Sequence, residues 1–140
     1  MNLKALIVED DFTCRGWLCS LVKKHGFSEV AQATNGEEAV AAAARMKPDI
    51  VLLDVSMPLQ TGPKALPAIL AAHPGARVVM VTSIADQGTV LECLEKGAVG
   101  YIRKDSPVEE ISRLLTEWRE AITTQRNRGG TDAREPSARR

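Results

Sequence analysis

Acidic residues directly follow two apolar segments of this chain, and their chemistry fits a metal site. The acids at 9–11 come after a run that opens the chain, and Asp54 comes after the run 50–53. Carboxylates that share a site repel one another and raise each other's pKa, and a divalent cation relieves that repulsion. Mg²⁺ prefers oxygen ligands and usually keeps waters beside one or two carboxylates. We therefore expect Asp10 and Asp54 to be direct Mg²⁺ ligands and Glu9 to hold a metal-bound water.

A hydroxyl and an ammonium group follow two later apolar runs. Thr82 can donate a hydrogen bond, and Lys104 is a movable cation that suits a phosphoryl group. Each polar residue alone has a simpler explanation: a solvated turn for the acids, a loop cap for Asp54, a helix cap for Thr82, a surface charge for Lys104. Because parallel strands end at one edge of their sheet, their joint position favours a shared site.

Apolar runs alternate five times with helical spacing, which predicts an α/β fold with a doubly wound, five-stranded parallel sheet and helices on both faces. The expected strands are 3–8, 30–33, 50–53, 77–81 and 99–102. The expected helices are 14–22, 36–46, 63–72, 86–96 and 107–122. Pro67 is expected either to bend the third helix or to shift its start past Pro63.

Composition and charge predict one folded domain with a basic tail. The chain has 140 residues, of which 44% are hydrophobic, with 18 basic and 18 acidic residues. Five arginines and two acids lie from Gln125 onward, which leaves 13 basic and 16 acidic residues before it. We expect a domain over 1–124 and a disordered tail over 125–140. An acidic body does not suggest direct nucleic-acid binding.

The cysteines and the apolar segments predict a cellular location. Three cysteines without metal-ligand spacing suggest free thiols in a reducing compartment. We see no leader sequence and no apolar stretch near the roughly 20 residues of a membrane helix. The expectation is a soluble cytoplasmic protein without membrane contact.

The sequence resembles the receiver domain of two-component response regulators over about Leu3–Thr124. The resemblance rests on separated motifs that occur in the same order. They are Leu6–Asp11, Asp54–Pro58, Gly62, Val81–Ser83 and Gly97–Lys104. It implies a flavodoxin-like strand order, 2-1-3-4-5. The chain departs from the commoner family pattern in carrying Glu-Asp as its first acidic pair and Asp105 where many relatives have proline.

The resemblance also implies a role for individual residues. Asp54 matches the phospho-accepting aspartate, Glu9 and Asp10 match the Mg²⁺-binding acids, and the Ser56 backbone carbonyl completes the metal shell. Lys104 matches the family's lysine.

The matching switch residues are Thr82, whose hydroxyl would turn toward the phosphoryl group, and Tyr101, whose ring would then turn inward. Ser56 and Ile84 flank the line of water attack on the acyl phosphate. Because Ile84 is apolar and cannot orient a water, we expect a longer-lived phosphorylated state than in relatives with an acid or amide there. Faster decay after Ile84→Glu is the corresponding test.

The implied function is that of a stand-alone response regulator rather than an enzyme. A histidine kinase or a histidine phosphotransfer protein donates the phosphoryl group, and slow self-catalysed hydrolysis removes it. The fourth helix, fifth strand and fifth helix, about Asp86–Trp118, would bind a downstream protein. The fifth helix, with Trp118, is a candidate for a homodimer contact.

Other functions stay open. The chain could be a phosphorelay intermediate or a phosphate sink. It could also be the truncated receiver of a transcription factor, because Lys104–Ser106 resembles receivers fused to helix-turn-helix domains. A Mg²⁺-dependent phosphatase is disfavoured, because Ser56 stands where such enzymes have an acid two residues after the nucleophile.

Overall fold

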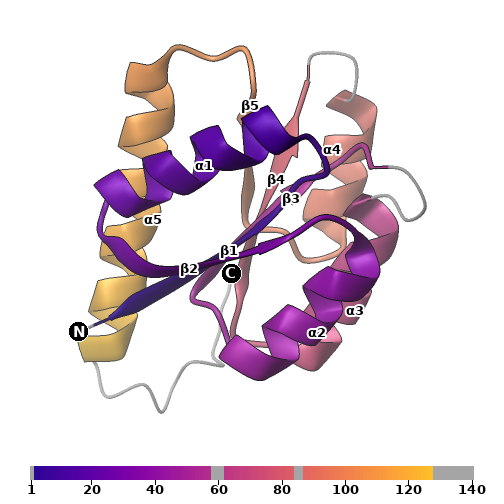
Figure 1. Cartoon of the computed structure of the whole chain (residues 1–140), viewed down its shortest axis with the longest axis horizontal. Coiled ribbons are helices and arrows are strands. Elements are labelled where there is room, and N and C mark those ends of the chain that lie inside the picture. The colour runs from indigo at the N-terminus through magenta and orange to yellow at the C-terminus, as the bar shows by residue number, and fades with distance from the viewer. Residues whose placement is uncertain (1, 58–61, 84–86, 128–140) are drawn as a thin grey trace.

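Strands and helices alternate along the chain as the sequence predicts, and a computed structural model describes residues 2–57, 62–83 and 87–127 (Figure 1). The strands are β1 (Leu3–Val8), β2 (Phe27–Ala33), β3 (Ile50–Asp54), β4 (Arg77–Thr82) and β5 (Gly100–Arg103). The helices are α1 (Phe12–Lys24), α2 (Gly36–Met46), α3 (Gly62–Ala72), α4 (Gln87–Glu95) and α5 (Val108–Asn127).

The five strands form one parallel sheet in the order β2-β1-β3-β4-β5, which confirms the expected topology. The register aligns the strand ends. Val8 of β1 pairs with Leu53 of β3, and Asp54 pairs with Val81 of β4. Thr82 in turn pairs with Arg103 of β5. The polar residues at and just beyond these ends therefore meet along one edge of the sheet.

The central strands are apolar throughout because helices cover both faces of the sheet. Alternate residues of each strand enter different cores. In β3, Val51 and Leu53 face a core shared with α2, α3 and α4, whereas Ile50 and Leu52 face a core shared with α1 and α5. Figure 1 shows these two groups of helices on opposite sides of the sheet.

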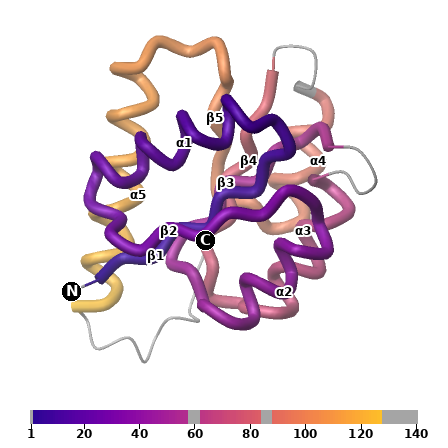
Figure 2. The backbone as a smooth tube through the Cα atoms, viewed as in Figure 1, coloured from indigo at the N-terminus to yellow at the C-terminus, as the bar shows by residue number. Residues whose placement is uncertain are grey.

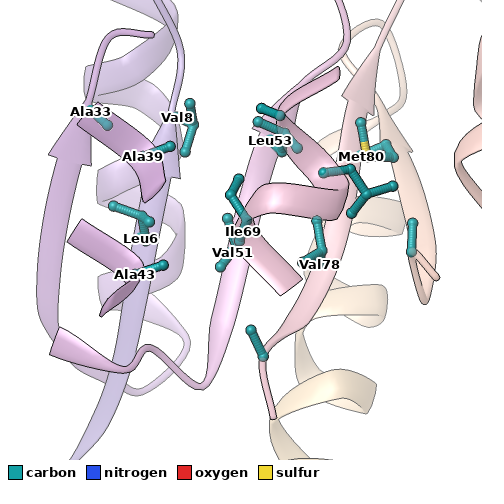
Figure 3. Close-up of a cluster of buried hydrophobic side chains, with 14 of the residues drawn as sticks. Leu6, Val8, Ala33, Ala39, Ala43, Val51, Leu53, Ile69, Val78 and Met80 are labelled. Carbon is teal, nitrogen blue, oxygen red and sulfur yellow. The ribbon is translucent and has the colours of Figure 1, made fainter. Parts of the chain in front are cut away.

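The core under α2 and α3 is built from small helix residues packed on branched strand residues (Figure 3). Ala39 and Ala43 of α2 bring that helix close to β1, and Ile69 of α3 lies over β3. The alanine-rich sequence of α2 thus has a packing reason, since a larger side chain there would push the helix off the sheet.

The starts of β2 and α3 can be compared with the sequence expectations. β2 begins at Phe27 rather than Val30, because its first residues pair with β1 through Leu3. α3 begins at Gly62, so Pro67 does not move its start past Pro63. The Gly62 N–H donates to the Val55 carbonyl at 3.1 Å and fixes that start.

The last helix continues through Asn127, past the domain boundary expected at Thr124. Arg126 Nη1 donates to the Asn2 carbonyl at 3.1 Å and to Asp49 Oδ2 at 3.2 Å, which ties the end of α5 to the start of β1 (Figure 2). Residues 128–140 lie outside the described part of the chain. None of the helices described has the length and apolar character that crossing a membrane requires.

Candidate functional site

Asp54 is the last residue of β3 and is held by the backbone around it. Its side chain is buried, with 3% of the residue exposed. The Ser56 N–H donates to Asp54 Oδ1 at 3.3 Å, and the Val55 N–H continues the sheet by donating to the Val81 carbonyl at 2.9 Å. Gly62 packs against the Asp54 carbonyl so closely that a Cβ there would collide with it.

Glu9 follows β1 and lies beside Asp54, as the register predicts. Only 1% of the residue is exposed. Its Oε2 accepts a hydrogen bond from the Asp11 N–H at 3.2 Å. Its Oε1 is buried and accepts no hydrogen bond in the described structure, although the Lys104 ammonium lies 3.2 Å away in an ion pair.

Glu9, Asp10 and Asp54 form one carboxylate cluster. One oxygen of each lies within 4.8 Å of the others. Glu9 and Asp54 are buried, and Asp10 is exposed at the opening. Asp11 has a different task, because its Oδ2 accepts from the Cys14 N–H at 2.7 Å and caps α1. The acids at 9–11 therefore divide into two cluster residues and one helix cap.

Lys104 brings a positive charge to this cluster from the end of β5. Its N–H donates to the Thr82 carbonyl at 2.8 Å, which places it beside β4. Its Nζ lies 3.2 Å from Glu9 Oε1 and 3.5 Å from Asp54 Oδ1. Burial lowers the pKa of Lys104, but the carboxylates of Asp54 and Glu9 outweigh burial and raise that pKa above its ordinary value.

Asp54 has the most perturbed carboxyl group of the site. Burial, together with the neighbouring Glu9 carboxylate, raises its pKa to about 7. The Lys104 ammonium and the Ser56 N–H act in the opposite direction without cancelling it. The Lys104 ammonium alone therefore does not neutralise the cluster, and a second cation bound there would be stabilised by the remaining negative charge.

The cluster fits a hard divalent cation. Three carboxylates and one ammonium leave excess negative charge at this site, and the Glu9 Oε1 oxygen is a buried acceptor without a hydrogen bond. A ligand set made only of oxygen atoms suits Mg²⁺ rather than a thiophilic metal. The residues that would hold the ion are those that the sequence suggested, Asp10, Asp54 and Glu9.

The remaining expected site residues occupy different positions. Thr82 is buried at the end of β4, where its carbonyl accepts from the Lys104 backbone N–H, and its Oγ1 donates to the Ser83 carbonyl at 3.0 Å. Ser56 is exposed at the start of the loop after β3. Tyr101 lies in β5 with 45% of its surface exposed. Ile84 lies outside the described residues, so the hydrolysis expectation remains a prediction.

Two residues near the site were not anticipated. Arg15 of α1 donates to the Glu9 carbonyl from Nη1 at 3.0 Å. Cys14 lies close enough to Glu9 that burial and this carboxylate raise the pKa of its thiol to about 12, which excludes a thiolate at neutral pH. The sequence pattern placed position 14 at the start of a helix and its cysteine among the free thiols, and no local signal reveals the long-range contact of Arg15.

Known proteins share this fold and sequence pattern. The family model described as "Response regulator receiver domain" matches residues 5–116. Chemotaxis protein CheY of Listeria monocytogenes is 40% identical over 113 residues, covering 81% of this chain and 95% of that protein. The response regulator domain of Thermotoga maritima CheB has a TM-score of 0.76 and 30% identity, covering 88% of this chain and 98% of that chain.

A second solved structure similar to this chain contains a metal ion. It is the CheX–CheY complex with BeF3 and Mg²⁺ from Borrelia burgdorferi. It has a TM-score of 0.73 and 30% identity, covering 83% of this chain and 89% of that chain.

Proposed function

Because the chain belongs to the response regulator receiver domain family, we propose that it accepts a phosphoryl group on Asp54 from a phosphohistidine. An Asp54 carboxylate oxygen attacks phosphorus, and the new P–O bond forms as the P–N bond to the donor imidazole breaks. The bonding electron pair returns to that nitrogen. The observation that carries the proposal is the buried Asp54 carboxylate, set between an ammonium group and two further carboxylates at the end of β3.

Asp10, Asp54 and Glu9 would hold Mg²⁺, and the exposed Ser56 would place its backbone carbonyl at the same opening. When bound, Mg²⁺ neutralises charge on the transferring phosphoryl group and on the carboxylates. The protein's own part is positioning and exclusion of water: Glu9 and Asp54 are fixed by backbone hydrogen bonds and almost fully buried.

Lys104 and Thr82 supply the remaining contacts to the phosphoryl oxygens. The Lys104 ammonium already lies within 3.5 Å of Asp54 Oδ1 and can follow the added charge, since its side chain is one-third exposed. The Thr82 hydroxyl now donates to its neighbour's carbonyl and would turn to donate to the phosphoryl group. The phosphoryl group carries about 1.5–2 negative charges at pH 7 in place of the single charge of the carboxylate, so phosphorylation adds about one negative charge and new acceptor oxygens that attract both groups.

The switch would act on the face formed by α4, β5 and α5. Movement of Thr82 leaves space for the half-exposed Tyr101 ring, and Leu91, Val99 and Val108 are exposed hydrophobic residues of the same region. A protein target of the phosphorylated state would bind there. The expected donor is a histidine kinase or a histidine phosphotransfer protein, and the free thiols of the chain fit a cytoplasmic setting.

The direct test is intact-mass measurement after incubation with acetyl phosphate and Mg²⁺. We expect one phosphoryl adduct that decays on standing. Asp54→Asn removes the attacking oxygen, and a chelator removes the cation, so either change should abolish the adduct.

The fold alone does not make the adduct depend on both Asp54 and Mg²⁺, so a control variant is needed to interpret its loss. Asp49→Asn removes a carboxylate from the opposite end of the strands, where it pairs with Arg126, and should leave the adduct intact. An adduct that persists in Asp54→Asn, or none on the folded natural protein with either acetyl phosphate or a phosphorylated histidine kinase, would contradict the proposal.

A further inference from the structure

Arg15 joins three segments around the loop that carries the acidic pair. Its Nη1 donates to the Glu9 carbonyl at 3.0 Å, and its Nε donates to the Gln32 side-chain oxygen of β2 at 2.9 Å. Its guanidinium carbon lies 5.6 Å from the centre of the Phe12 ring. The planar fork of arginine suits such a bridge, because its donors point in fixed directions while its face stacks on an aromatic ring.

These contacts complete the restraint of Glu9. The Glu9 N–H donates to the Ala33 carbonyl of β2 at 3.0 Å, and its carbonyl accepts from Arg15. Its Oε2 accepts from the Asp11 N–H. Both peptide groups and one carboxylate oxygen are thus held, which leaves the buried Oε1 as the group that faces Asp54 and Lys104 without a hydrogen bond of its own.

We infer that Arg15, anchored by Gln32, is a positioning residue for the metal-binding acids Glu9 and Asp10. The inference rests on the proposed function and identifies a residue that acts through another. Residues that orient metal ligands typically change metal affinity by 10–100-fold when removed. Because Arg15 holds the peptide of Glu9 rather than its carboxylate, we expect Arg15→Gln to weaken Mg²⁺ binding by about 3- to 10-fold.

Electrostatics alone predicts the opposite change in Mg²⁺ affinity for Arg15→Gln, so the experiment distinguishes the two explanations. Removing a positive charge beside an acidic cluster should strengthen cation binding, since charge repulsion falls. A positioning role predicts weaker binding in spite of the lost charge. Gln32→Ala changes no charge and removes only the anchor of Arg15, so positioning predicts about a 2-fold weakening and electrostatics predicts no change.

The experiment is a calorimetric titration of Mg²⁺ into the full chain at fixed pH and ionic strength. The variants are Arg15→Gln, Arg15→Lys and Gln32→Ala. Arg113→Gln is the matched control, because it removes an exposed arginine of α5 that pairs with Glu117 at 3.2 Å. Thermal unfolding in the presence of a chelator verifies that each variant is folded.

The expected order of Mg²⁺ affinity is natural protein and Arg113→Gln first, then Gln32→Ala, then Arg15→Lys, with Arg15→Gln weakest. Arg15→Lys keeps the charge but cannot span Glu9 and Gln32 with one ammonium group. Unchanged or tighter Mg²⁺ binding in folded Arg15→Gln overturns the inference, as does natural affinity in Arg15→Lys together with Gln32→Ala.

A second readout separates positioning from a direct catalytic role. At saturating Mg²⁺, adduct formation from acetyl phosphate should return to within about 2-fold of the natural rate in the Arg15 variants, because Arg15 does not touch Asp54. A rate that stays low at saturating Mg²⁺ contradicts the inference. If the natural protein itself binds no Mg²⁺ and gains no adduct, the proposed function fails first, and the two failures are distinguishable.

Discussion

Asp54 combines two requirements that oppose each other. The attack on phosphorus that we propose for Asp54 requires an ionised carboxylate, yet burial and the Glu9 carboxylate raise the pKa of Asp54 to about 7. In the folded protein without a bound cation, ionising Asp54 therefore costs free energy. A bound divalent cation would remove that cost, so the raised pKa and the proposed metal site are two aspects of the same excess negative charge.

The raised pKa predicts a pH dependence of stability in the presence of a chelator. The folded protein holds a proton on Asp54 up to about pH 7, whereas the unfolded chain releases it near the ordinary aspartate pKa of 3.8. The folded state binds more protons in this window, so the free energy of unfolding should fall as pH rises from about 4 to above 7. We expect Asp54→Asn to be more stable than the natural protein at pH 8 by on the order of 1–3 kcal/mol, and this difference to be clearly smaller at pH 5.

Urea unfolding at the two pH values measures this difference. Comparison with Asp54→Asn cancels the contributions of other groups, such as His73, whose pKa is lowered by burial. Equal stability of the two proteins at pH 8 would mean that the ionised carboxylate carries no cost.

At the residue scale, the sequence predicted the acidic residues that lie together, but it did not predict Arg15, which holds the backbone of one of them. Asp54, Glu9, Thr82 and Lys104 follow apolar strands, and the parallel register places them together. Arg15 carries no such signal, because its partners come from a different strand and from a ring three residues away. Contacts that depend on the tertiary arrangement of polar surface residues have no periodicity to detect.

At the scale of elements, the start of α3 packs closely against the backbone at the end of β3. A Cβ on Gly62 would collide with the Asp54 carbonyl and lie 3.0 Å from Val55 Cα. These are backbone atoms that cannot rotate away. Gly62→Ala must therefore push α3 off the end of β3, the strand that carries the proposed phosphoacceptor Asp54.

We expect Gly62→Ala to lower the free energy of unfolding by about 2–3 kcal/mol and to reduce adduct formation with acetyl phosphate. Gly16→Ala is the matched control. A Cβ on Gly16 meets nothing within 4 Å, and an interior helical alanine is favoured over glycine by about 0.5–1 kcal/mol. A Gly62→Ala protein as stable as Gly16→Ala would contradict the close contact.

The strands and helices were predictable where burial is uniform, and less so at their ends. The central strands are apolar on both faces and left no ambiguity. β2 lies at an edge, and its first residues include the exposed Ser28 and Glu29, which resemble a loop in sequence. α5 extends past Thr124 because Gln125 and Arg126 find partners in Arg77 and Asp49, far away in sequence.

At the scale of the whole molecule, one of the two cores depends on the last helix. Ile111, Leu115 and Ile122 of α5 are buried, and they pack in the same core as Val79 and Ile102 of the sheet. Burying each of these side chains contributes about 1.5–3 kcal/mol. Their sum is comparable to the entire stability of a small domain, about 5–15 kcal/mol.

Truncation after Pro107 should therefore abolish cooperative unfolding, whereas truncation after Asn127 should preserve the midpoint of the full chain. Urea titrations monitored by circular dichroism and by tryptophan fluorescence compare the two. A cooperative transition in the shorter chain would show that α1 alone can cover that face of the sheet.

The bond from Arg126 to the Asn2 carbonyl also has a consequence during synthesis on the ribosome. β1 is synthesised well before α5, yet α5 completes the core on one face of the sheet and contacts Asn2, the residue before β1. The nascent chain can pack α2 and α3 on one face of the sheet while the opposite face is covered by α1 alone and still lacks α5. The apolar strand residues on the face that α5 covers therefore stay partly exposed until α5 has left the exit tunnel. A chaperone that binds apolar strands would bind the nascent chain in that interval.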